Sequence, residues 1–573
     1  MQNHTVPNYA DLFDDLNSYE VAVQEIPSDT IITVCIALIN ELNSPEDKFK
    51  LQDRIYKSLA KTFDMSDFHR IEKAFAVFKA TKNENFSGLI FGRRYLLEMI
   101  LRELNHFRTI DSLSGKAMEF DFFRAYLLMV QIVNEKDNEN IKFQKHEDGF
   151  QSSKYELIWK PILPQFEFSE RPHIIFETYK LFCFLKHAKL EYYQELKAYL
   201  NKNGFVSISQ LLTSFNQVNK VIQNDDPDAM LRKLTYLLPN VGIKQEHLIA
   251  QTINKVNGIT SFSMRSIKEF PLYLQPERGY MVIDPDFYLR KKYFGPFFEL
   301  YHKTSLKQRL SFNQYCIDVS GALERSLLEP LLTMVVNENA NVLHFDDNSK
   351  DVPDGYIRIG KMIFLFEYKA YIFNEQLTNY PEVAELKKYI DEKFVLTAKK
   401  KKKGITQLRD QINVIIGGGF HFDQASFLRE GEENVRIYPI ILHHDFMFGM
   451  PGVNEYLNEQ FEKIVPVHDL RYEIMPVTVM NLSVLLDMAL GQRDMIFMEQ
   501  MLIDYLNYLE QNRMMFAQNQ TSSNLMAGHM SFDELFRLHF VQHTATPEGT
   551  QKETLEKLLV LSEISFDDYK KEL

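Results

Sequence analysis

The sequence predicts an α/β core, a mixed sheet flanked by helices, embedded between larger, mainly α-helical N- and C-terminal regions. A strand hairpin is encoded in residues 351–370, and apolar residues on both sides of the core recur at helical spacing. Prolines and glycines cluster over residues 270–295, which marks a domain boundary. We therefore expect a helical sensor or assembly region over residues 1–290, an α/β domain over 291–450 and a helical region over 451–573.

The composition indicates a folded protein without a uniformly basic surface. Of the 573 residues, 45% are hydrophobic and 25% are charged, as in folded globular chains, and the length suits about two to four domains. The formal net charge of −13 argues against a uniformly basic surface, so any contact with nucleic acid needs a local basic patch.

Cysteine usage and hydropathy bear on location. Cys35, Cys183 and Cys316 show no metal-ligand spacing, and we interpret them as reduced thiols of a cytoplasmic protein. The N-terminus lacks the basic and apolar segments of a signal peptide. The longest apolar stretches, such as Ile31–Ile39, fall well short of the roughly 20 residues that span a bilayer, so we expect no membrane partner.

The N-terminal region carries apolar residues at mixed three- and four-residue spacing, which predicts helices. The clearest such segments are Ile31–Leu42, Phe49–Thr62, Leu89–Phe107, Phe120–Glu135 and Ile174–Asn201. Two basic clusters, Phe91–Tyr95 and Lys186–Lys189, fit solvated helix faces better than phosphate contacts. Target sensing, oligomerisation or inhibition of the core is our hypothesis for this region.

The hairpin in residues 351–370 carries the first chemical pattern. Gly360-Lys361 suits a two-residue II′ turn between apolar strands, and counting outward from it places Asp354 opposite Glu367. Lys369, two residues on, returns to the face of Glu367. An Asp before Gly can simply be a turn residue and a Glu-x-Lys pair a solvated strand face. Against this, both faces of Met362–Phe366 are apolar, which predicts a buried strand whose charges need partners.

Two carboxylates that close repel each other unless a cation or a proton lies between them. Oxygen ligands favour Mg²⁺, with Mn²⁺ as a substitute, over zinc. Such an ion polarises a phosphoryl oxygen, while a nearby lysine such as Lys369 orients water or stabilises charge at phosphorus.

Pro353-Asp354 followed by Glu367-Tyr368-Lys369 at the end of an apolar strand resembles the PD-(D/E)XK nuclease superfamily, over about Tyr293 to Asp445. The resemblance implies a Mg²⁺-dependent endonuclease core, with Asp354 and Glu367 as metal ligands and Lys369 at the attacking water. It also implies a Glu from the helix that precedes the sheet and a Gln or basic residue from the helix that follows it.

Glu324 matches the first of these expectations. It lies at the centre of an apolar stripe in the predicted helix Ser320–Val336, where an acid is either a costly burial or a group that meets a metal or a lysine. We expect Glu324 to support the metal site or to position water beside it. Pro330, one turn later, should break or kink this helix.

The segment after the hairpin supplies the remaining candidates. Within the run Lys399–Lys403, Lys402 and Lys403 could contact phosphates, although a solvated loop is the usual role of such runs. Gln407 on the following helix resembles the superfamily's glutamine, but it lies off the apolar stripe, which favours a simple exposed glutamine.

Two further expectations concern the end of the predicted core. Val435–Leu442 predicts a strand, at an edge or bulge because of Pro439. His443-His444 would end that strand without both binding one ion. In the C-terminal region we expect helices over Asn454–Ile464, Val477–Leu490 and Asp494–Met515.

The leading hypothesis is a metal-dependent nuclease acting on DNA, in the manner of bacterial defence against foreign DNA. RNA cleavage or processing of damaged nucleic acid would use the same site. The alternative is a non-catalytic module that binds nucleic acid or protein on a nuclease-like fold. A homo-oligomer or a regulatory partner acting through the helical regions is left open.

Overall fold

The computed structural model describes the greater part of the chain. The described residues are 7–13, 18–43, 48–81, 90–110, 118–140, 154–169, 172–214, 245–276, 278–336, 340–346, 351–378, 380–396, 401–430, 434–465, 471–519, 522–543, 548–565 and 567. Lys399 and Lys400 of the predicted lysine run lie outside them.

Contacts divide the chain into two compact units. The sheet unit lies within residues 143–191 and 310–565, and the helical unit lies within 3–142 and 192–309. Both units are discontinuous in sequence, so their borders do not follow the three consecutive regions expected above. Two helices from the first 290 residues belong to the sheet unit.

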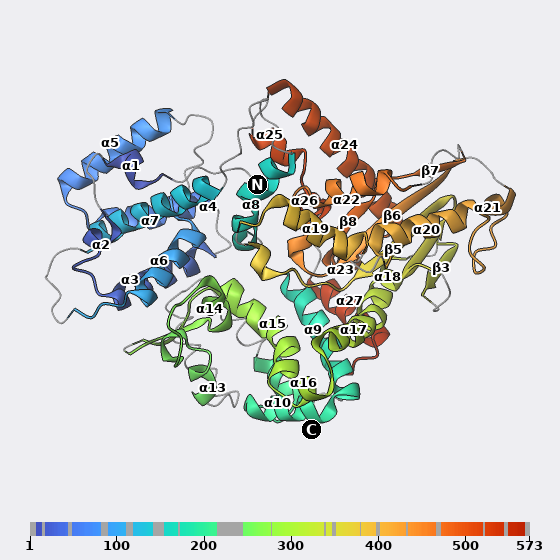
Figure 1. Ribbon diagram of the computed structural model, residues 1–573, viewed down its shortest axis with the longest axis horizontal. Helices are drawn as coiled ribbons and strands as arrows, with labels where there is room; N and C mark the ends of the chain where they lie inside the picture. Colours follow the sequence, from blue (N-terminus) through green and yellow to red (C-terminus); the bar gives the residue numbers. More distant parts are fainter. Residues whose placement is uncertain are drawn as a thin grey trace. The chain divides into compact units, whose positions relative to one another are not determined.

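The helical unit is built from short and medium helices with one two-stranded sheet, β1–β2 (Figure 1). Its elements are α1 (Tyr9–Leu12), α2 (Tyr19–Ala22), α3 (Ser28–Leu42), α4 (Lys48–Ala60), α5 (Met65–Thr81), α6 (Arg93–Asn105), α7 (Glu119–Asn140), α10 (Tyr193–Lys202), α13 (Gln245–Ile249), the 3-10 turn η1 (Ile253–Lys255), α14 (Met264–Glu269), β1 (Leu272–Gln275), β2 (Gly279–Val282), α15 (Pro285–His302) and α16 (Leu306–Arg309).

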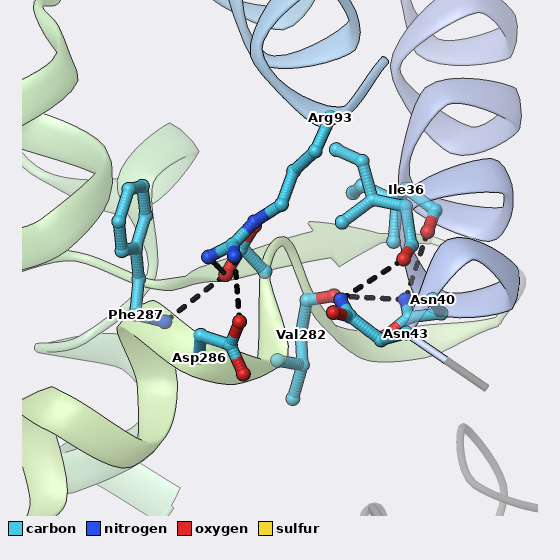
Figure 2. Close-up of polar contacts among 9 residues, drawn as sticks. Ile36, Asn40, Asn43, Arg93, Val282, Asp286 and Phe287 are labelled. Carbon is cyan, nitrogen blue, oxygen red and sulfur yellow. Dashed lines mark hydrogen bonds and ion pairs between the residues drawn. The ribbon is translucent and has the colours of Figure 1, made fainter. Parts of the chain in front are cut away.

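Polar contacts tie distant segments of the helical unit together. Arg93, the first residue of α6, pairs with Asp284 and with Asp286 at 2.5 Å, at the start of α15 (Figure 2). Asn40 of α3 donates to the carbonyl of Val282 at 3.3 Å. The basic cluster around Arg93 therefore makes largely buried internal ion pairs and does not form the solvated helix face expected from the sequence.

The sheet unit holds the α/β core. Its elements are α8 (Lys154–Ser169), α9 (Ile174–Glu191), α17 (Phe312–Leu323), the π-helix η2 (Glu324–Leu328), α18 (Glu329–Val335), β3 (Val342–Phe345), β4 (Gly355–Ile359), β5 (Met362–Lys369), the 3-10 turn η3 (Glu375–Thr378), α19 (Val383–Phe394), α20 (Gly404–Ile416), α21 (Ser426–Glu430), β6 (Val435–His443), the 3-10 turn η4 (Phe446–Gly449), α22 (Val453–Glu462), β7 (Tyr472–Ile474), β8 (Thr478–Asn481), α23 (Ser483–Leu490), α24 (Met495–Asn519), α25 (Ser522–Ala527), α26 (Phe532–His543) and α27 (Glu548–Leu561).

The sheet of this unit is mixed, as predicted. Its strand order is β3-β4-β5-β6-β7, with β8 also paired to β6; β3, β4 and β5 are antiparallel, whereas β6 is parallel to β5, β7 and β8. Helix α20 lies along β5 and β6 (Figure 1), and α8, α19 and α22 contribute to the same apolar core. On the other face Leu332 of α18 packs so close to Gly355 that a Cβ there would meet its Cδ1 at 2.5 Å.

The predicted hairpin is confirmed in its register. Ile359 pairs with Met362, and Gly360 has φ 57°, the sign that the first position of a II′ turn requires. Strand β5 lies between β4 and β6 and is buried from Ile363 to Lys369. The apolar residues on both of its faces therefore reflect a central strand.

Two strand predictions need correction. The edge alternative for Val435–Leu442 is wrong, because the strand is paired on both sides. The bulge alternative fits, since between the pairs Ile437–Ile474 and Ile440–Thr478 the β7–β8 side has one extra residue, opposite Pro439. The irregularity is thus in the neighbouring strands. The expected helix over Val477–Leu490 is wrong in its first part, which forms β8 and completes the sheet.

The described residues include no helix that is both long enough and apolar enough to cross a bilayer.

Candidate metal centre

Strand register gathers acidic residues at one edge of the sheet unit. Gly355, the first residue of β4, pairs with Phe345 on one side and with Phe366 on the other. The side chains one step beyond these three positions share a face, since side chains alternate along strands. These residues are all acidic: Asp346, Asp354 and Glu367.

Hydrogen bonds fix the two predicted carboxylates. Asp354 Oδ2 accepts the backbone N–H of Tyr368 at 2.6 Å, across the end of the hairpin. Glu367 is fully buried, and its Oε2 accepts from Lys369 Nζ at 2.6 Å. The same ammonium lies 3.6 Å from Asp354 Oδ2. Lys369 therefore lies between both carboxylates, as the hairpin register predicts.

Gln411 of α20 contacts Glu367, which the sequence did not reveal. Its Nε2 donates to Glu367 Oε1, and its own Oε1 is buried without a hydrogen-bond partner among the described residues. Gln407, the predicted glutamine, is half-buried one turn earlier on the same helix. Residues four apart share a helix face, so Gln407 lies one turn before the glutamine that contacts Glu367.

Glu324 reaches the site from a widened helical turn. Pro330 does not end the helix; instead the chain runs from α17 through the π-helical turn η2, which begins at Glu324, into α18. The N–H of Glu329 bonds to the carbonyl of Glu324, five residues earlier. Turns of this kind often occur at functional positions.

Helix α9 satisfies the carbonyl that Pro330 leaves without a donor. In an α-helix the residue at position 330 would donate to Ser326 O, but proline has no N–H. Tyr179 Oη donates to this oxygen at 3.2 Å and Cys183 Sγ donates at 3.1 Å. Tyr179 Oη also shares a hydrogen bond of 2.5 Å with Ser562 Oγ, after α27. The turn that carries Glu324 is thus supported by segments far away in sequence.

We expect Tyr179→Phe to destabilise the protein by about 1–2 kcal/mol, because a buried carbonyl and a buried hydroxyl both lose a partner. Tyr288→Phe is the matched control, since the Tyr288 hydroxyl is buried and has no hydrogen-bond partner in the described part of the chain. That change should stay within about 0.5 kcal/mol. Denaturant unfolding followed by circular dichroism measures both; equal effects would contradict this role for Tyr179.

Burial and mutual repulsion raise the pKa values of acidic residues at the site. Burial first and then the charge of Asp354 raise the pKa of Glu324 to about 8 and that of Glu367 to about 7. Burial lowers the pKa of Lys369, but the carboxylates of Glu367 and Asp354 outweigh it and raise this pKa above its usual range. The site holds more negative charge than one lysine balances.

Among the described residues, the carboxylates that could hold a metal ion together are Glu324, Asp346 and Asp354. One oxygen from each lies within 4.8 Å of the others. Glu367 is outside this group and binds Lys369 and Gln411 instead. Asp346 was missed because its position depends on the register of β3. The available signal was an acid directly after the strand-like segment Val342–Phe345.

Lys402 and Lys403 differ in their surroundings. Lys402 is exposed and pairs with Asp410. Lys403 precedes α20, and its ammonium lies 5.6 Å from the centre of the Tyr371 ring.

The two histidines at the end of β6 contact different partners, as their adjacent positions predict. His443 Nε2 is 3.7 Å from Asp533 Oδ2, and burial lowers its pKa to about 4. His444 Nδ1 lies 2.8 Å from Tyr368 Oη.

Comparison of the chain with protein-family models, with curated proteins and with solved structures gives no match. The superfamily resemblance therefore rests on the residues themselves.

Proposed function

We propose that the protein is a metal-dependent nuclease that hydrolyses phosphodiester bonds, with DNA as the favoured substrate. The observation that carries the proposal is the convergence of Glu324, Asp346 and Asp354 beside the Lys369–Glu367 pair. Four segments contribute these side chains to one edge of the sheet. An acid cluster alone is common on proteins, but here a buried lysine, Lys369, also lies 3.6 Å from Asp354, one of the three carboxylates.

The donor set suits Mg²⁺ or Mn²⁺. All three groups offer oxygen ligands. One oxygen from each lies within 4.8 Å of the others, which is close to the roughly 3–4 Å that separates ligands around an octahedral Mg²⁺. Zinc sites favour nitrogen and sulfur ligands, and His443 and His444 do not belong to this group. The raised pKa of Glu324 reflects negative charge that a divalent cation would balance.

Each residue has a distinct role in the proposed reaction. When bound, Mg²⁺ supplies polarisation of a phosphoryl oxygen. Asp354 is held in orientation by the Tyr368 N–H, so the carboxylate is preorganised. The Lys369 ammonium stabilises negative charge that develops at phosphorus. Glu367 and Gln411 position Lys369 from the buried side, since Glu367 bonds to both.

The raised pKa values predict that the stability of the metal-free protein depends on pH. Without a divalent cation, Glu324 and Glu367 keep protons up to about pH 8 and about pH 7 in the folded protein, whereas the unfolded chain releases them near 4.5. Stability therefore falls as pH rises through this window, because the folded state binds more protons.

A cation that replaces these protons should reverse the effect. We expect Mn²⁺ to raise the melting temperature more at about pH 8.5 than at about pH 6. Thermal unfolding with Mn²⁺ or with chelator at both values measures this. A shift that is independent of pH would contradict the assignment of Glu324 to the metal group.

One observation favours a second candidate, a non-catalytic binding module. Glu367 is 0% exposed and Lys369 is 8% exposed, as expected for a structural ion pair. Glu324 and Asp354 are only half-buried, and Asp346 is exposed. The two candidates differ in whether the exposed carboxylates support cleavage.

The test is cleavage of plasmid and linear DNA, single- and double-stranded, and of RNA, with Mg²⁺, Mn²⁺ or chelator. The nuclease proposal predicts cutting that requires the cation and that Asp354→Asn abolishes. Absence of cutting on every substrate, together with Mn²⁺ binding that Asp354→Asn leaves unchanged, would favour the binding module.

A further inference from the structure

Two lysines surround one tyrosine just beyond the candidate metal centre. Tyr371 follows β5 by two residues, and it is half-buried. Lys393 of α19 places its ammonium 4.9 Å from the centre of the Tyr371 ring, and Lys403 places its own at 5.6 Å. Lys393 also lies 5.3 Å from the ring centre of Tyr389. Three separate segments therefore bring two positive charges to one aromatic ring.

Neither charge is balanced within the described part of the chain. No described carboxylate pairs with Lys393 or Lys403, in contrast to Lys402, which pairs with Asp410. Both lysines are half-buried, so water screens their repulsion less than it would on an open surface. A cation over a ring gains only about 0.5–1 kcal/mol at exposed sites, which does not replace a counter-ion. This arrangement favours an anion as the missing partner.

The start of α20 adds to the positive potential. Lys403 is the residue before this 13-residue helix, whose N-terminus carries partial positive charge. Gly404 has φ 32°, and a Cβ there would meet the Phe394 carbonyl at 2.6 Å. Glycine thus lets the helix begin against α19, and the Lys403 N–H donates to the Val395 carbonyl at 3.0 Å, directly after the end of α19 that carries Lys393.

The pair lies beside the carboxylates. Tyr371 is two residues past Lys369, the last residue of β5, whose ammonium lies 3.6 Å from Asp354 Oδ2. An anion held by Lys393 and Lys403 would therefore adjoin the position where a scissile phosphate meets the metal group.

We propose that Lys393, Lys403 and Tyr371 form a phosphate subsite that holds the backbone of a nucleic-acid strand next to the cleaved bond. This rests on the proposed function for its substrate, but the binding itself needs no cation and no cleavage. The ligand chemistry is a phosphate group, and the proposal commits to a phosphodiester chain as its source. Free inorganic phosphate is the other source that the experiment distinguishes.

The experiment measures binding of labelled single-stranded and double-stranded DNA by fluorescence anisotropy in chelator, with the full chain. Lys393→Gln combined with Lys403→Gln should weaken binding about tenfold or more. For a single strand the slope of log affinity against log salt should decrease by about 1.4, as two phosphate contacts are lost. Lys393→Arg with Lys403→Arg should restore affinity to within about threefold, because both charges remain.

Lys361→Gln combined with Lys388→Gln is the matched control, since both lysines are exposed and the change in net charge is the same. It should leave affinity within about twofold. Thermal unfolding of every variant verifies the fold. Equal losses in the two glutamine pairs, an unchanged salt slope, or no DNA binding by the wild type would overturn the subsite. Weaker binding of inorganic phosphate with unchanged DNA binding would overturn its assignment to a strand.

The outcome is separable from the nuclease proposal. If DNA binding depends on Lys393 and Lys403 but no cation supports cleavage, the subsite stands and the nuclease proposal falls. If cleavage needs Asp354 while the glutamine pair binds and cuts like the wild type, the subsite falls alone.

Discussion

Lys369→Met is expected to reduce the rate of Mn²⁺-dependent DNA cleavage by roughly 10²–10³-fold, the usual cost of removing one group that stabilises developing charge. The ammonium is the only cation of the described site that contacts both Glu367 and Asp354, at 2.6 and 3.6 Å. Single-turnover cleavage at saturating DNA measures the effect. Lys361→Met, at the exposed turn of the same hairpin, is the control and should retain wild-type rates.

Stability must be measured in parallel, because Lys369 also balances a buried charge. Breaking a buried ion pair typically costs about 3–5 kcal/mol, although protonation of Glu367 at low pH reduces this. Lys369→Arg keeps the positive charge and should keep most of the stability. A Lys369→Met protein that is folded and cuts within about threefold of the wild type would contradict the role of Lys369.

Asp354→Asn should weaken Mn²⁺ binding by at least about tenfold, since loss of an outer partner alone costs about 10–100-fold in metal affinity. The fold should persist, because the Asn carbonyl can still accept the Tyr368 N–H. Isothermal titration calorimetry with Mn²⁺ measures the affinity. Asp351→Asn is the control: this neighbouring residue has φ 62°, which asparagine tolerates.

In the protein without metal, we expect Asp354→Asn to be stabilising, in contrast to its weakening of Mn²⁺ binding. The charge of Asp354 raises the pKa of both Glu324 and Glu367, so its removal should lower both values. Chelator-treated Asp354→Asn should then be more stable than the wild type at about pH 8. Lower stability under these conditions, with unchanged Mn²⁺ affinity, would show that Asp354 is a structural residue.

Local rules were sufficient for the hairpin of the sheet unit. The turn at Gly360-Lys361 fixes the register of β4 and β5, so the convergence of Asp354, Glu367 and Lys369 could be counted from the sequence. No such turn links β3 to β4 within the described residues, and the position of Asp346 could not be counted in the same way. Glu324 was found from the apolar stripe of its helix, because burial of an acid requires a partner.

Tertiary contacts account for what the sequence did not reveal. The widened turn at Glu324 depends on Tyr179 and Cys183, which lie 147 and 143 residues before Ser326 in the sequence and donate to its carbonyl, left without a donor by Pro330. The short apolar segment Val477–Asn481 is compatible with either a strand or a turn of helix. Only its pairing with β6 shows that it forms a strand. Whether Gln407 or Gln411 contacts Glu367 depends on the position of α20 along β5, which no local sequence pattern determines.

The most direct test of the central claim is one Mn²⁺ titration in which metal binding and DNA cleavage are followed in the same samples, for the wild type and Asp354→Asn. Electron paramagnetic resonance reports free Mn²⁺, and a labelled oligonucleotide reports cutting. The account predicts that cleavage rises with occupancy of the site and that both curves shift together in Asp354→Asn. Cleavage that persists in chelator, or Mn²⁺ binding that saturates equally in both proteins, would contradict it.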